Sequence, residues 1–321
     1  MVESDKPVTL VPIFSDPAYY TKALNYRRRT SNYVEAVQKW ADASFCGHVV
    51  EKLVANIGDG SDDKPLYVLG VGSGRERRLG TGWLVEMPLV PTSIYEVELV
   101  FLNKLLLKFP KIHTCVVEPC VNLLTQYQHN MKEKATNLTF DWQNRTFEEF
   151  VKLQQEKSLK YHFISACHSM YYVKNLNETL QSLYDMLALG GIILITITAD
   201  YAGTGKVCRI LPSEDESPNT ASSSPHYRDS ADIHDALRQL QIPYHIDTYK
   251  CHRMITRCFD EKESEEGNLV LDFLTHTFRF RDTPKDLFQQ VLACIKDCSV
   301  QRGNDWFFQS EHVCYFISKP K

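Results

Sequence analysis

The sequence predicts a doubly wound α/β fold with a mostly parallel, seven-stranded sheet, and three observations lead to it. Short apolar runs alternate with longer segments in which apolar residues recur every three or four positions, as in strands joined by crossover helices. A glycine cluster, Gly70, Gly72 and Gly74, directly follows the first run. The chain of 321 residues with 43% hydrophobic content is long enough to bury one large core. We therefore expect residues 1–321 to form a single domain.

The expected strands are short apolar runs bounded by polar or turn-forming residues. Five of them form the centre of the sheet, at 66–70, 113–118, 138–142, 161–167 and 192–198. Helical periodicity fills the intervals between them, at 97–109, 121–133, 147–156 and 176–187. Two further strands are expected at 245–255 and 312–320, and further helices at 230–241, 269–277 and 284–297. Ser230 is the expected N-cap of the first of these helices.

Three segments are additions to this core. Residues 1–60 form an expected N-terminal helical cap, in which Tyr33 and Trp40 share one helix face. Packing is one interpretation of that face, and closure of a ligand pocket at the sheet edge is the other. Residues 75–95 are interpreted as an insertion after the glycine cluster. Residues 203–229 are rich in Ser and Pro, and they are expected to form a flexible flap.

Composition and charge exclude several classes of function. The chain has 36 basic and 40 acidic residues, so it lacks the positive field that holds nucleic acid. Its longest apolar stretch, residues 190–199, is about half as long as a membrane helix, and the N-terminus lacks a signal-peptide pattern. Ten cysteines without a Cys-x-x-Cys pair favour reduced thiols over disulfides or a zinc site. We expect a cytoplasmic protein that uses no metal, membrane or nucleic acid.

The glycine cluster and the end of the second strand predict a cofactor site. Closely spaced glycines let the backbone approach a ligand, and Glu118 ends the second strand, where a carboxylate can accept hydrogen bonds from ribose hydroxyls. NAD and S-adenosylmethionine would both use such a carboxylate. The glycine pattern lacks the last glycine of the dinucleotide fingerprint, which favours S-adenosylmethionine. A solvated carboxylate at a strand end is the structural alternative for Glu118.

The end of the fourth strand carries polar and aromatic residues where a ligand would bind in this architecture. Tyr171 and Tyr172 either cover the core or wall a pocket for a flat cationic substrate through cation–π contact. His168 is either a hydrogen-bonded histidine at a strand end or the acceptor of a proton from an attacking nitrogen.

Four motifs together resemble the histamine N-methyltransferase family, and the resemblance covers nearly the whole chain. They are FSDPAYY near the N-terminus, VVEP at the end of the second strand, FISACHSMYYVKN after the fourth, and GNLVLDFLT late in the chain. The resemblance implies a monomeric, cytosolic, class I methyltransferase that moves a methyl group from S-adenosylmethionine to an imidazole nitrogen. It also places cofactor contacts on Gly70, Glu118 and Cys167, with the other glycines beside them. The family's serine after the third strand falls on Phe147, and Thr146 beside it is the expected substitute.

The substrate side departs from the family pattern. The resemblance places the family's imidazole-binding glutamate on Tyr33, its glutamine after the fourth strand on His168, and its C-terminal asparagine near Glu311. We therefore expect a small imidazole or amine acceptor lined by Tyr33, His168, Tyr171, Tyr172 and Glu311, with His168 or Glu311 as the base and histamine as a poor acceptor. A histidine-containing dipeptide is one alternative acceptor. A binding protein without turnover is the alternative from another class.

The insertion at 75–95 generates the first testable prediction. Without it, Gly74 joins Glu96 in a continuous match to the family pattern, and Glu118 follows Gly74 by 23 positions instead of 44, close to the roughly 20 that the ribose carboxylate needs. Ser93 and Glu96 can form a capping box that restarts the helix.

We hypothesise that the insertion is either a retained non-coding stretch or a loop that lowers cofactor affinity. Deletion of 75–95 should leave S-adenosylmethionine binding as tight as in the full chain, or tighter, in a calorimetric titration. Weaker binding by the folded deletion variant would show that the insertion contributes to the site.

Overall fold

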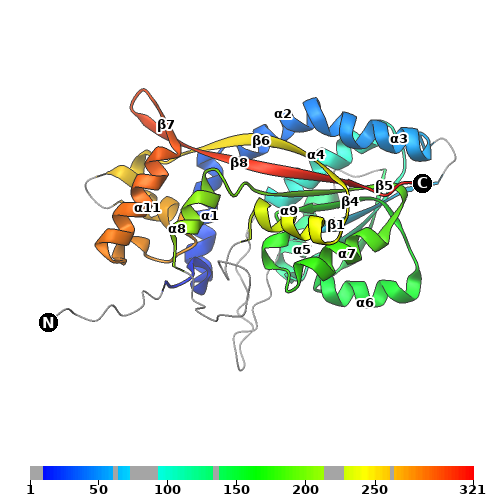
Figure 1. Ribbon diagram of the computed structural model, residues 1–321, viewed down its shortest axis with the longest axis horizontal. Coiled ribbons are helices and arrows are strands. Elements are labelled where there is room, and N and C mark those ends of the chain that lie inside the picture. Colours follow the sequence, from blue (N-terminus) through cyan, green and yellow to red (C-terminus); the bar gives the residue numbers. More distant parts are fainter. Residues whose placement is uncertain (1–9, 61–63, 73–92, 133–136, 213–227, 261–263) are drawn as a thin grey trace. The chain divides into compact units, whose positions relative to one another are not determined.

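The computed structural model describes residues 10–60, 64–72, 93–132, 137–212, 228–260 and 264–321 (Figure 1). Its strands are β1 (Leu66–Val71), β2 (Ile112–Val117), β3 (Leu138–Gln143), β4 (Tyr161–Cys167), β5 (Leu187–Thr198), β6 (Tyr244–Met254), β7 (Ser299–Arg302) and β8 (Asp305–Ser318). Its longer helices are α1 (Pro17–Thr30), α2 (Tyr33–Trp40), the π-helix η2 (Ala41–Val50), α3 (Glu51–Ile57), α4 (Ser93–Leu106), α5 (Val121–Lys132), α6 (Phe147–Lys157), α7 (Leu176–Met186), α8 (Thr204–Ile210), α9 (Ser230–Gln239), α10 (Glu265–Thr275) and α11 (Lys285–Asp297).

The strands form one mixed sheet in the order β3-β2-β1-β4-β5-β8-β6, and β7 pairs with β8 as a hairpin. Neighbouring strands from β3 to β5 are parallel, and β8 runs antiparallel to β5. The five predicted central strands and the four helices between them are confirmed. Since sequential parallel strands need crossover helices, this alternation produces the doubly wound arrangement. Among the described helices, none is long and apolar enough to cross a membrane.

Several boundaries differ from the prediction. Asp229, not Ser230, caps α9, because its Oδ1 accepts a hydrogen bond from Ala231 N at 3.0 Å and its N–H donates to Asp232. The segment predicted as a flap contains helix α8, while residues 213–227 of it lie outside the described residues. The hairpin strand β7 was not predicted, because its four residues are mostly exposed and lack an apolar run.

The described chain folds into two compact units. The sheet unit consists of Tyr33–Thr198, Asp229–Tyr249 and His312–Lys321. The helical unit consists of Met1–Asn32, Ala199–Arg228 and Lys250–Glu311. The expectation of one domain over the whole chain stays a prediction.

Helices cover both faces of the strands in the sheet unit. Figure 1 shows α2, α3 and α4 on one side of these strands and α6, α7 and α9 on the other. The predicted apolar face of α2 is confirmed, since Tyr33 and Trp40 are buried along it. Phe45 of η2 stacks on Phe101 of α4 at 4.7 Å and meets Phe163 of β4 edge-on at 5.6 Å. This aromatic contact joins two helices to the centre of the sheet.

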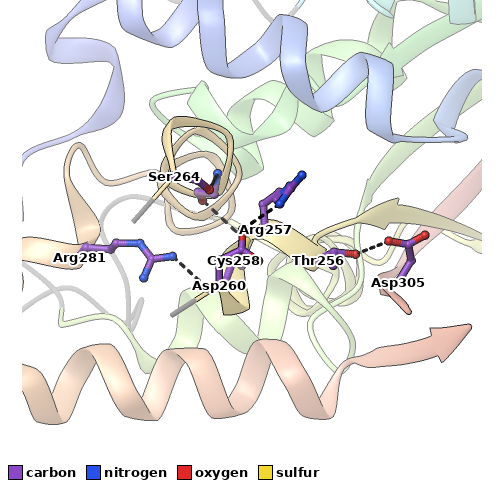
Figure 2. A network of polar contacts seen from close by, with 8 residues as sticks. Thr256, Arg257, Cys258, Asp260, Ser264, Arg281 and Asp305 are labelled. Carbon is purple, nitrogen blue, oxygen red and sulfur yellow. Dashed lines mark hydrogen bonds and ion pairs between the residues drawn. The ribbon is translucent and has the colours of Figure 1, made fainter. Parts of the chain in front are cut away.

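A polar network holds the helical unit around η4 (Thr256–Phe259), as Figure 2 shows. Arg281 Nη2 donates a hydrogen bond to the carbonyl of Cys258 at 3.0 Å, and Thr256 Oγ1 donates to Asp305 Oδ1 at 3.0 Å. These bonds connect the turn after β6 to β8 and to the residues that follow α10. An apolar core from α8, α10, α11 and β8 lies beside them.

The buried aspartate of the GNLVLDFLT motif has a structural task in this unit. Asp272 accepts hydrogen bonds from Tyr19 Oη at 2.8 Å and from the backbone N–H groups of Arg279 at 2.8 Å and Phe280 at 2.9 Å. Burial raises the pKa of Asp272, and the hydrogen bonds act in the opposite direction. The motif therefore fixes the chain that leaves α10 against α1.

The second prediction concerns the Phe45 contact. Phe45 is fully buried, so Phe45→Ala removes a packed ring and should lower the free energy of unfolding by about 3 to 5 kcal/mol. Urea unfolding followed by circular dichroism measures it. Leu107→Ala is the control, because Leu107 is 71% exposed and its loss should change stability by less than about 0.5 kcal/mol. Equal effects of the two changes would contradict the assignment of Phe45 to the core.

Candidate functional site

The carboxyl ends of β1, β2 and β4 meet at one edge of the sheet, where ligands bind in open α/β folds. β1 ends in the glycine turn, of which Gly70 and Gly72 are described. Gly74 and most of the predicted insertion lie outside the described residues, and α4 begins at Ser93 after them. The sequence predicts that residues at these strand ends form the site.

Two carboxylates pack against the bare backbone of the glycine turn. A Cβ on Gly70 would overlap the carboxylate of Glu98 on α4, and a Cβ on Gly72 would overlap the carboxylate of Glu118. Glu118 is buried, and its Oε1 accepts a hydrogen bond from the N–H of Cys120 at 2.8 Å. Glycine is needed at both positions because any side chain would displace these groups. Glu118 thus lies where the sequence placed it, while the sequence did not single out Glu98.

Glu98 is fully enclosed by the sheet unit. Burial raises the pKa of Glu98 to about 7, and the hydroxyl of Tyr127 acts in the opposite direction. At a pKa of about 7, the protonated and the ionised forms of Glu98 are both populated near neutral pH. A protonated carboxyl group is also a hydrogen-bond donor, so Glu98 can both donate and accept beneath the turn.

The predicted cofactor residue Thr146 is the N-cap of α6. Its Oγ1 accepts a hydrogen bond from Glu149 N at 3.2 Å, and Glu149 Oε2 accepts one from Thr146 N at 3.0 Å. This capping box fixes the helix start after β3. The hydroxyl proton of Thr146 is a further donor, which is the role that the sequence assigned to it.

Cys167 is the last residue of β4, and it is buried beside Ser165. Its Sγ lies 3.4 Å from Ser165 Oγ. Burial raises the pKa of the Cys167 thiol to about 11, so the group stays protonated at neutral pH. A neutral thiol at this place is suited to packing against a ligand and not to nucleophilic attack.

Rings from four segments converge beyond the end of β4. This strand-end cluster consists of Tyr33, His168, Tyr171, Tyr249 and His312, all within the sheet unit. The His168 ring is 5.6 Å from Tyr33, 5.9 Å from Tyr171 and 4.9 Å from His312. Tyr33, His168 and Tyr171 were predicted to lie together, and the structure brings them together. The side chain of Tyr172 lies outside the described residues.

Hydrogen bonds connect His168 to the end of β5. His168 Nδ1 is 2.8 Å from Tyr171 Oη, which is 2.9 Å from Thr198 Oγ1 and accepts a hydrogen bond from Thr198 N at 3.0 Å. His168 adopts the left-handed conformation with a φ of 54°, which is uncommon for a residue with a side chain. Its N–H donates to Thr196 O at 2.9 Å and holds that turn in place.

Tyr33, which the resemblance places at the family's glutamate, is buried. Its hydroxyl accepts a hydrogen bond from Tyr249 Oη at 3.2 Å, and its ring lies edge-on to His312 at 5.5 Å. Sequence reasoning missed Tyr249 and His312. The available signal was that each lies in a predicted late strand. In the structure, His312 pairs with Thr198 across β8 and β5.

Glu311 belongs to the helical unit, and its carboxylate has partners there. Tyr201 Oη donates to Glu311 Oε1 at 3.0 Å, and Lys250 Nζ lies 3.6 Å from Oε2. Burial raises the pKa of Tyr201 to about 12, and the hydrogen bond to Glu311 adds to that effect. Glu311 as a base and substrate residue stays a prediction.

Comparison with known proteins gives a consistent set of matches. The family model described as "Methyltransferase domain" matches residues 42–319. Histamine N-methyltransferase B of Xenopus laevis is 29% identical over 300 residues, covering 87% of this chain and 92% of the relative. Histamine N-methyltransferase of Mus musculus is 26% identical and covers 89% of both chains. Together with the strand order, the family match confirms the predicted class of fold.

The third prediction follows from Glu98. The pKa of Glu98 rises on folding from an ordinary 4.5 to about 7. Its contribution to the free energy of unfolding is therefore fully present below pH 4.5 and is lost as the pH rises through 7. The unchanged protein should therefore lose up to about 3 kcal/mol of its free energy of unfolding between pH 5 and pH 8, and Glu98→Gln should abolish this loss.

Urea unfolding at the two pH values measures the difference. The exposed Glu51→Gln is the control, and it should keep the pH dependence of the unchanged protein. A Glu98→Gln protein with that same pH dependence would contradict the assignment.

Proposed function

The chain belongs to the methyltransferase-domain family, and on that premise we propose that it is an N-methyltransferase that acts on a small imidazole or amine. The methyl donor is S-adenosylmethionine. The observation that carries the proposal is the buried carboxylate of Glu118 packed against the bare backbone of Gly72. The similarity to histamine N-methyltransferases of several vertebrates supports nitrogen as the accepting atom.

The residues at the sheet edge fit the donor. Gly70 and Gly72 let the carboxylates of Glu98 and Glu118 reach the turn, and the carboxylate of Glu118 is suited to the two hydroxyls of a ribose. Thr146 and Cys167 would complete its surroundings from the ends of β3 and β4. When bound, the donor supplies a methyl group on a positively charged sulfur, which a neutral nitrogen can attack in line.

The chain's own contribution to the transfer is orientation, exclusion of water and acceptance of a proton. The rings of Tyr33 and Tyr171 wall the end of β4, where a flat acceptor would stack. His168 lies between these rings, so its imidazole is placed to take the proton that the nitrogen loses. Glu311 and Tyr172 remain candidates for the same site. We also expect the protein to act as a cytosolic monomer.

Tyr33 supports a choice among possible acceptors. A phenol cannot pair with an ammonium group as a carboxylate does, and its hydroxyl is already bonded to Tyr249. Histamine is therefore expected to be a poor acceptor, and imidazoles without an ammonium group are favoured. A histidine-containing dipeptide is the alternative among imidazoles.

The test of the function is a methyl-transfer assay against histamine, simple imidazoles, histidine dipeptides and primary amines. An imidazole without an ammonium group should be methylated about ten- to hundred-fold more efficiently than histamine, because a missing charged partner costs about 1 to 3 kcal/mol. Histamine as the best acceptor would contradict the interpretation of Tyr33. No transfer to any member, together with no binding of S-adenosylmethionine, would identify an inert relative of the enzymes.

The fourth prediction concerns the cofactor. Glu118→Ala should weaken S-adenosylmethionine binding by about 2 to 4 kcal/mol, because two charge-assisted hydrogen bonds are lost. Calorimetric titration of the folded variant measures this, and the exposed Glu51→Ala serves as the control with unchanged affinity. An unchanged affinity of Glu118→Ala for S-adenosylmethionine would mean that the Glu118 carboxylate does not bind the cofactor.

A further inference from the structure

The hydroxyl of Tyr171 lies at the centre of a short hydrogen-bond chain whose protons can be counted. Its oxygen has one proton to donate and two lone pairs. The backbone N–H of Thr198 can only donate, and it uses one lone pair at 3.0 Å. One proton and one lone pair of Tyr171 remain for two neighbours, His168 Nδ1 at 2.8 Å and Thr198 Oγ1 at 2.9 Å.

Two arrangements satisfy this count. In the first, Thr198 Oγ1 donates to Tyr171, Tyr171 donates to His168 Nδ1, and the ring proton of His168 is on Nε2. In the second, His168 Nδ1 donates to Tyr171 and Tyr171 donates to Thr198 Oγ1, so the ring proton is on Nδ1. Only the second leaves a lone pair on Nε2, so only the second allows His168 to accept a proton there.

The second arrangement also accommodates the product of proton transfer. A protonated imidazole donates from both ring nitrogens, so its partner at Nδ1 must be an acceptor. Tyr171 can be that acceptor because Thr198 Oγ1 takes the Tyr171 proton. The same hydroxyl chain therefore fits His168 before and after it gains a proton, without rotation of the ring.

The backbone fixes the positions of His168, Tyr171 and Thr198 in the protein without substrate. His168 turns out of β4 with a φ of 54°, and the 3-10 turn η3 (Met170–Tyr172) returns the chain so that the Tyr171 ring stacks on His168 at an interplanar angle of 18°. Thr198 is the last residue of β5 and is buried. A strained residue held by fixed partners is typical of a preorganised site.

We propose that Tyr171 and Thr198 are positioning residues that fix His168 in the tautomer protonated on Nδ1, so that Nε2 takes an N–H proton of the methyl acceptor. The inference rests on the proposed function, and it narrows the substrate class to azoles and amines that lose a proton on methylation. In the transfer, a nitrogen lone pair of the acceptor forms the bond to the methyl carbon while the carbon–sulfur bond breaks and leaves its electron pair on sulfur. An N–H bond of the acceptor then breaks, its electron pair stays in the acceptor, and a new N–H bond forms at His168 Nε2. In an amine this proton is on the attacking nitrogen, and in an imidazole it is on the other ring nitrogen. The proton then passes to water.

The tautomer is measured directly by ¹⁵N–¹H NMR of the histidine rings in protein labelled with ¹⁵N-histidine, without substrate or cofactor. His168→Gln identifies the His168 signals by their disappearance. We expect the unchanged protein to carry the His168 proton on Nδ1. Thr198→Val removes Oγ1 but keeps the backbone N–H, so Tyr171 must donate to Nδ1 and the proton should move to Nε2. A proton on Nε2 in the unchanged protein would overturn the proposal.

Kinetics with paired acceptors provide the second readout. Thr198→Val and Tyr171→Phe should each lower kcat/KM about 100-fold for an imidazole with N–H, the size typical of a general base. For a pyridine, which carries no N–H, Thr198→Val should change kcat/KM less than about threefold. Thr198→Ser restores Oγ1 and should recover most of the loss seen with Thr198→Val.

A control variant separates this mechanism from a structural role. Tyr244→Phe removes a comparable bond, that of Tyr244 Oη to His234 Nδ1 at 2.7 Å, outside the strand-end cluster, and should leave transfer to both acceptors unaffected. Equal losses on the two acceptors in Thr198→Val would mean a structural role and overturn the proposal. If the unchanged protein methylates no nitrogen acceptor, the proposed function fails, and the NMR result still decides the tautomer of His168.

Discussion

The packing of two carboxylates against bare glycine backbone is the contact on which the edge of the sheet depends. Glu98 reaches the turn from α4 and Glu118 reaches it from the end of β2, and each occupies the space that a Cβ would fill. The turn, the helix after it and the second strand are therefore mutually fixed. Because both carboxylates are buried, their environment is set by the fold and not by solvent, and the raised pKa of Glu98 is one result.

The antiparallel strand β8 adds a second constraint, because it inserts between β5 and β6. Its register places His312 opposite Thr198, so a residue near the end of the chain joins residues from β4 and β5. The left-handed turn at His168 then directs that ring toward His312 instead of along the strand. The ring cluster is thus a consequence of strand order and of one uncommon backbone conformation.

Much of this could be predicted from the sequence, and what was missed has physical reasons. The central strands are continuous apolar runs since both faces are buried, and residues directly after them, such as Glu118 and His168, fall at the sheet edge by topology alone. Tyr249 and His312 were missed because pairing of β8 within the sheet brings them in, and local pattern does not encode such non-local pairing. The cap of α9 was wrong by one residue because two adjacent side chains, Asp229 and Ser230, are both good caps.

Under the proposed function, Tyr33 at the place that the resemblance gives to a family glutamate would change the charge of the acceptor site. A carboxylate near the acceptor would favour a cationic substrate and would attract its proton before transfer. Tyr33 and Tyr171 offer uncharged hydroxyls instead, and each is bonded to another hydroxyl, that of Tyr249 or Thr198. A hydroxyl can exchange donor and acceptor roles without gaining charge, so in the proposed mechanism a proton leaving the acceptor would change the net charge of His168 alone. Selection among acceptors would then depend on whether the acceptor carries an N–H proton to lose, and less on whether the substrate carries a positive charge.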